Sequence, residues 1–115
     1  NVFFPGIYVQ IEATSAAFQV SSVSTDLKDR EPSCPYDYYY TISITSTSAG
    51  KVKYYITDSA GGQSSTTSLT FEEAGTLEKD HSWQIPSTGA YWIKVYIESP
   101  NNQWFGPFKF DITCQ

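Results

Sequence analysis

The chain has 115 residues, a formal net charge of −5, and 46 Val, Ile, Thr, Tyr, Phe and Trp residues against 10 Leu and Ala. The length fits one domain, and the excess of β-branched and aromatic side chains excludes an all-α or Rossmann-type protein. The negative charge makes a nucleic-acid backbone a poor partner. Charged residues make up 17% of the chain while Ser and Thr number 27. This uncharged polar surface favours an exported protein, either extracellular or at the cell surface.

Residues 1–16 are predicted to lie outside the main domain, which we place at residues 17–115. Ile7, Val9 and Ile11 alternate and fit an extra edge strand, while the Pro, Gly and Ala residues around them fit an ordered linker. Both alternatives stay open. No run of eighteen apolar residues occurs, so we expect no membrane insertion by this segment. We expect any targeting segment, anchor or further domain to lie outside this chain.

Beyond these residues, apolar and polar side chains alternate with the period of two that marks β-strands, and no helical period is evident. The expected strands are residues 18–27, 38–45, 51–57, 67–71, 77–85, 91–98 and 108–112. Seven short strands separated by turn residues predict an all-β, immunoglobulin-like sandwich of two antiparallel sheets. A change of phase near Ser22 and Val23 predicts a β-bulge in the first strand. The expected core is Ile42, Ile44, Val52, Ile56, Ile93, Val95, Phe108 and Phe110.

The two cysteines, Cys34 and Cys114, fit no zinc, haem or CxxC spacing. Cys114 shares the inward parity of Phe110, and Cys34 shares that of Tyr36. Because strand direction alternates in a seven-strand sandwich, the second strand begins at the pole where the seventh ends. We therefore predict a Cys34–Cys114 disulfide if the protein is secreted, with two unrelated thiols as the alternative.

Several short motifs within residues 18–114 form a set. They are Cys34-Pro35, Thr70-Phe71, Gly75, Trp83, the run GAYWIKV at 89–95, Ser99-Pro100-Asn101 and the final Cys114. This set resembles bacterial extracellular immunoglobulin-like modules. The resemblance implies a secreted or surface-anchored β-sandwich that is often joined to another domain or to a membrane anchor. It implies no catalytic residue.

Two groups of polar residues contain the residue types found in catalytic or metal sites. The run Asp-His-Ser at 80–82 contains those of a hydrolase triad, but neighbours on a strand point to opposite faces and cannot form the relay. His81 is expected to be a partly buried structural residue. Asp26, Asp29 and Glu31 offer carboxylates for calcium, but interspersed cations favour a solvated loop instead. We expect no catalytic residue, no metal site and no cofactor.

An exposed aromatic face is predicted on the sheet that contains the third, sixth and seventh strands. Its outward residues are expected to include Lys53, Tyr55, Trp92, Lys94 and Tyr96. Aromatic rings on a flat sheet offer large, rigid area to a glycan or a protein partner. The alternative is that these rings only stabilise the sheet by cross-strand packing.

A second candidate site is the stretch between the sixth and seventh strands, expected as a loop over residues 99–107. Asn101, Asn102, Trp104 and Phe105 combine amides with aromatic rings, a set that can contact a sugar or a peptide. The alternative is that Trp104 or Phe105 folds back to cap the sandwich.

The leading functional hypothesis is a non-catalytic extracellular interaction or spacer module whose partner is a protein or a glycan. One alternative is a carbohydrate-binding module that uses the exposed aromatic residues. Another is a protease inhibitor of immunoglobulin-like fold. An enzyme is not expected, because the strand geometry does not bring together the residues of a catalytic triad, a catalytic dyad or a metal site.

Overall fold

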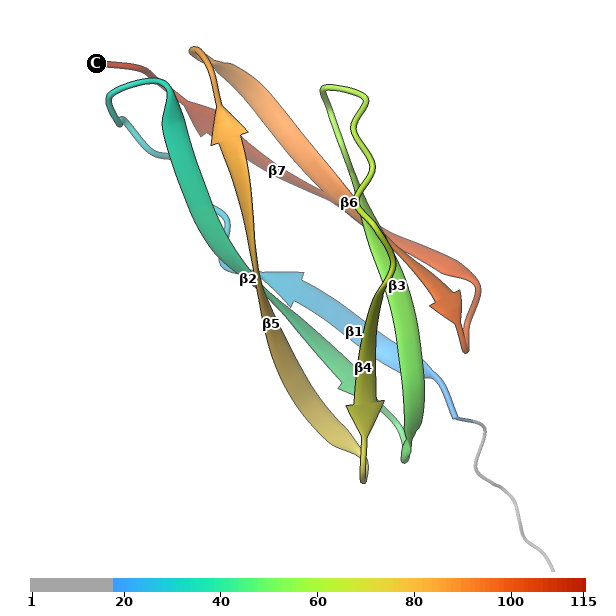
Figure 1. Cartoon of the computed structure of the whole chain (residues 1–115). Coiled ribbons are helices and arrows are strands. Elements are labelled where there is room, and N and C mark those ends of the chain that lie inside the picture. Colours follow the sequence, from blue (N-terminus) through green and yellow to red (C-terminus); the bar gives the residue numbers. More distant parts are fainter. Residues whose placement is uncertain (1–17) are drawn as a thin grey trace, which may run out of the picture.

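The computed structural model describes residues 18–115, which form seven strands in two antiparallel sheets without a helix (Figure 1). The strands are β1 (Val20–Thr25), β2 (Tyr36–Ser46), β3 (Gly50–Asp58), β4 (Thr67–Phe71), β5 (Gly75–Ile85), β6 (Gly89–Ser99) and β7 (Gln103–Ile112). One sheet has the order β1-β2-β5 and the other β4-β3-β6-β7. The predicted all-β sandwich is confirmed. The expected boundary at residue 16 lies outside the described residues.

The alternation of side chains explains the core between the sheets. Along β2 and β3 every second residue is buried, as the pleat of a strand in a two-layer fold requires. The buried core residues are Val20, Val23, Tyr38, Tyr40, Ile42, Ile44, Val52, Tyr54, Ile56, Phe71, Ile85, Ile93, Val95, Ile97, Phe110 and Ile112. Every expected core residue is among them except Phe108, which is partly buried because β7 is an edge strand.

The predicted bulge in the first strand is present, although it lies slightly nearer the start of the strand than expected. The pairing of β1 with β2 shifts between Val20 and Ser22, so Ser21 is the extra residue. Because of this shift, Val20 and Val23 both face the core although they are three residues apart.

The expected loop over residues 99–107 is wrong in its second half, because β7 already begins at Gln103. Gly106 and Pro107, which indicated a loop, lie instead in a bulge where the register between β6 and β7 shifts by one residue. Gly106 has φ 111, a conformation that glycine adopts without steric cost. Pro107 lacks an N–H group, which is tolerated at a bulge in an edge strand.

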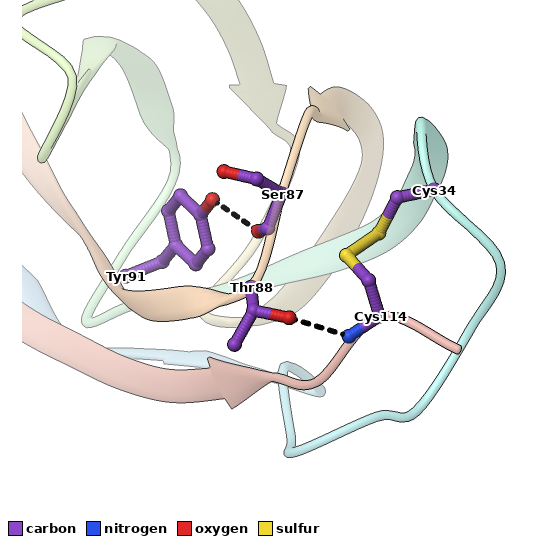
Figure 2. Close-up of a disulfide and its surroundings, with 5 residues drawn as sticks. All are labelled: Cys34, Ser87, Thr88, Tyr91 and Cys114. Carbon is purple, nitrogen blue, oxygen red and sulfur yellow. Dashed lines mark hydrogen bonds between the residues drawn. A yellow bond between two sulfur atoms is a disulfide. The ribbon is translucent and has the colours of Figure 1, made fainter.

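The predicted disulfide joins the two sheets at one pole of the sandwich. Cys34 lies just before β2, Cys114 lies just after β7, and their Cα atoms are 5.5 Å apart (Figure 2). The backbone N–H of Cys114 donates a hydrogen bond of 2.8 Å to the Thr88 hydroxyl. Segments 80 residues apart are thereby held together, as the alternating strand directions predict.

A tyrosine close to this disulfide anchors the turn before β6. The hydroxyl of Tyr91 donates a hydrogen bond of 2.6 Å to the carbonyl oxygen of Ser87, four residues earlier (Figure 2). A tyrosine near the start of the sixth strand that bonds back to the preceding turn is a feature of immunoglobulin-like sandwiches. The turn and the disulfide thus form one ordered end of the molecule.

Candidate functional site

Three aromatic residues lie side by side across the outer face of the four-stranded sheet. The strand register pairs Tyr55 of β3 with Tyr96 of β6, and Tyr96 with Trp104 of β7. Tyr55 and Tyr96 each lie between two buried residues, and Trp104 pairs directly with Tyr96 and is 49% exposed, so all three point away from the core. We call these three residues the aromatic cluster.

The rings of the aromatic cluster contact one another closely. Ring centroids are 5.2 Å apart for Tyr55 and Tyr96, 4.7 Å for Tyr96 and Trp104, and 6.0 Å for Tyr55 and Trp104. Their planes are inclined by 42°, 50° and 89°, respectively, so the cluster is not a flat platform. Trp104 remains 49% exposed while both tyrosines are partly buried. The cluster therefore presents one indole on a base of two phenol rings.

Trp92 forms a second, separate feature on the same face. The ammonium group of Lys94 lies 5.1 Å from the centre of the Trp92 ring, a cation–π arrangement. Trp92 also pairs across the strands with Lys109 of β7. Two of its neighbours on this face are thus cationic.

The outer face of the four-stranded sheet is basic although the chain is acidic. Four of the six lysines of the sequence occupy its outward positions: Lys51, Lys53, Lys94 and Lys109. Outward carboxylates there are Glu98 and Asp111, of which Glu98 accepts a hydrogen bond from Thr66. We call this basic surface with its aromatic rings the aromatic face.

The predicted loop residues separate into different roles. Asn101 is used internally, because its amide bonds both the N–H and the carbonyl of Val20 at 2.7 Å. Asn102 is exposed in the turn with φ 57. Phe105 is partly buried and packs against the core, while Trp104 faces outward. The structure thus joins Trp104 to Tyr55 and Tyr96 and leaves Asn101 and Phe105 out of that surface.

His81 has the partly buried, structural position expected from its parity. Its Nε2 shares a hydrogen bond of 2.8 Å with the Tyr54 hydroxyl, and its ring stacks on Tyr40. Burial, followed by the charge of Lys79, lowers the pKa of His81. Burial raises the pKa of Tyr54 to about 12. Asp80 bonds Thr41 on the opposite face of β5, so no triad relay forms.

Carboxylates in the segment before β2 accept hydrogen bonds from backbone N–H groups. Asp26 accepts a hydrogen bond of 2.8 Å from the N–H of Thr41, and Asp29 accepts one of 2.8 Å from the N–H of Asp111. Within residues 18–115 no group of three or more His, Cys, Asp or Glu residues is placed to hold a metal ion. These carboxylates therefore connect the segment to β2 and β7.

Two features of the surface and interior were not predicted from the sequence. Tyr39 is 74% exposed on the outer face of the three-stranded sheet, where the alternation did place it but no neighbouring ring marked it. A pocket of about 270 Å³ lies between the sheets and is lined by residues that include Tyr40, Asp58 and Trp83. Residues of four strands, β2, β3, β5 and β6, and of the segment after β3 line it, so no local pattern indicated it.

Comparisons with known proteins indicate the fold alone. No protein family matches the chain, and no curated protein matches it. Among solved structures, a CARDB domain of the PF1109 protein from Pyrococcus furiosus, described as a complex with di-metal ions, is similar with a TM-score of 0.71. The two are 11% identical, and the match covers 90% of this chain and 100% of that one. The chain is therefore similar to a CARDB domain in its immunoglobulin-like β-sandwich.

Among residues 18–115 no helix is long and apolar enough to cross a membrane.

Proposed function

We propose that this protein is a non-catalytic, extracellular interaction module that binds a protein partner through the aromatic face. The main support for this proposal is the aromatic cluster, in which the exposed Trp104 contacts Tyr55 and Tyr96. A tryptophan fixed by neighbouring rings loses little conformational freedom on binding, which is why such residues often dominate interface energies.

The charge of the aromatic face supports a partner with a complementary, acidic contact surface. Lys53 and Lys94 flank Tyr55 and Tyr96 on the same face, so a contact surface with carboxylates around an apolar centre is complementary to it. The rings are inclined by up to 89°, which favours insertion of Trp104 into a protein pocket over stacking along an extended glycan.

An extracellular setting is supported by the disulfide, because such bonds persist in oxidising compartments. The di-metal ions of the CARDB structure are not transferred to this chain. The two chains are only 11% identical, and residues 18–115 bring together no group of three or more metal-ligating side chains.

The test is a binding screen with the wild-type chain and two alanine variants against arrays of purified extracellular domains and of glycans. We expect a protein ligand whose affinity falls about 30-fold or more in Trp104→Ala, the effect of a residue at an interface centre. Tyr39→Ala is the matched control, since it removes a more exposed ring from the other sheet. Its affinity should equal that of the wild type.

Three outcomes would contradict the proposal. Binding that Trp104→Ala retains would place the contact elsewhere. Binding to glycans alone would support the carbohydrate-binding alternative. The absence of any ligand would support a spacer role.

A further inference from the structure

A buried hydroxyl without a partner marks a second candidate site, away from the aromatic face. Tyr40 is 5% exposed, and its hydroxyl makes no hydrogen bond with any of residues 18–115. A buried polar group without a partner is costly, so such groups in native proteins usually have a water molecule or a ligand. The Tyr40 side chain lines the pocket of about 270 Å³ between the sheets.

The pocket exists because β4 covers only half of β3. β4 pairs with residues from Gly50 to Tyr54, and beyond this point the chain that follows β3 folds back beside it. This segment bonds Ile56 through the N–H and the hydroxyl of Ser64. The side of the sandwich between β3 and β5 is therefore closed by a loop, which leaves room next to His81 and Trp83.

A carboxylate on the loop side is the only formal charge among the described residues that line this pocket. Oδ1 of Asp58 accepts hydrogen bonds of 2.9 Å from the N–H groups of Ala60 and Gly62, whereas Oδ2 has no partner within residues 18–115. No Lys or Arg of that range forms an ion pair with Asp58. Lys79, two residues before His81 on β5, is exposed and does not line the pocket. A negative charge and a phenol oxygen thus remain available beside two aromatic walls.

We propose that this pocket binds an organic cation, an alkylammonium group that donates hydrogen bonds to Asp58 and Tyr40 while its carbon chain contacts His81 and Trp83. A carboxylate beside aromatic rings is the combination that recognises ammonium groups. A neutral hydroxyl compound leaves the charge of Asp58 uncompensated, and a metal ion needs more oxygen ligands than these two side chains supply. The volume admits a side-chain-sized group but not a drug-sized molecule.

An ammonium group of this kind belongs either to a free amine or to a lysine side chain of a polypeptide. The experiment therefore uses four probes: n-butylammonium chloride, its neutral analogue n-butanol, a blocked peptide with one lysine, and the same peptide with norleucine. Binding to the ¹⁵N-labelled chain is followed by NMR through the indole N–H of Trp83 and the amides of Gly62 and Ser64, which line the pocket.

We expect saturable shifts of these signals with n-butylammonium and with the lysine peptide, and none with the neutral analogues. Asp58→Asn keeps an oxygen for the turn N–H groups and removes the charge, so its affinity should fall about 10-fold or more, the loss of a charge-assisted hydrogen bond. Tyr40→Phe should weaken binding by a smaller factor. Asp80→Asn, which removes the same charge from the outer face of β5, should bind like the wild type.

The result also separates the two sources of the ammonium group. Much tighter binding of the lysine peptide identifies a polypeptide ligand, and equal binding identifies a free amine. Equal shifts with n-butanol, an equal loss in Asp80→Asn, or no saturable shift would overturn the proposal and leave a pocket filled by water. None of these outcomes depends on Trp104, so this experiment tests the pocket independently of the aromatic face.

Discussion

The outer faces of the two sheets share one strand pattern and differ in chemistry. On the three-stranded sheet the outward residues of β2 and β5 are mainly Ser, Thr and acidic residues, including Asp37, Glu78 and Asp80, with Tyr39 alone among them. On the four-stranded sheet the outward residues include three contacting aromatic rings and four lysines. Period-two alternation is the same on both, so the periodicity determines the fold while the identity of the outward residues gives each face its own surface chemistry.

The largest effect is expected where the two sheets are joined covalently. Replacement of both cysteines by serine should lower the free energy of unfolding by about 4 to 5 kcal/mol, since the disulfide closes a loop of some 80 residues. Urea unfolding of the double variant measures the loss, and the wild type under reducing conditions is the control. Equal stability of all three samples would show that noncovalent contacts alone hold this pole.

The next effect compares the two outer faces directly. Trp104→Ala should cost about 1 to 3 kcal/mol of stability, because it removes ring contacts to Tyr55 and Tyr96. Tyr39→Ala should change stability by less than about 0.5 kcal/mol, since it is exposed and has no ring contact within residues 18–115. Thermal unfolding of both variants checks the difference. Similar losses would mean that the cluster is not a cooperative unit.

The inner faces allow a smaller and sharper comparison. Tyr54→Phe should lower the free energy of unfolding by about 1 kcal/mol, because its hydroxyl bonds His81. Tyr40→Phe should leave the ligand-free chain unchanged or more stable, because this hydroxyl has no partner among the described residues. Each variant removes one tyrosine hydroxyl oxygen. Urea unfolding of both measures the change in the free energy of unfolding. A destabilised Tyr40→Phe would indicate a tightly held water or ligand.

The smallest effect is a dependence of stability on pH through His81. Its pKa is lower in the folded protein than in the unfolded chain, so the unfolded chain binds the proton more readily. Its contribution to stability is therefore complete above the ordinary value of 6.5 and is lost as pH falls below it. Unfolding between pH 7.5 and about 5.5, compared with His81→Gln, isolates this contribution. A variant that keeps the same slope would assign it to other groups.

Much of the fold followed from the sequence because each strand carries its own alternation. Ile42 and Ile44, or Ile93 and Val95, have the same parity wherever the strand is placed, so their burial was predictable. The disulfide was predictable for a related reason, since strand direction alone brings Cys34 and Cys114 to one pole. The role of Gly106 was not predictable from the sequence, because a glycine followed by a proline indicates a turn and a bulge in an edge strand equally well.

The sequence by itself determined the fold class, the alternation of inward and outward residues and the pole at which both cysteines lie, because these depend on periods of two and on strand direction. Only the tertiary structure decided which outward rings meet and which inward polar groups are satisfied. Tyr55, Tyr96 and Trp104 contact one another through the cross-strand register, which bulges and turns determine. Tyr40 and Asp58 line the same pocket because the two sheets pack face to face, an arrangement that no local pattern encodes.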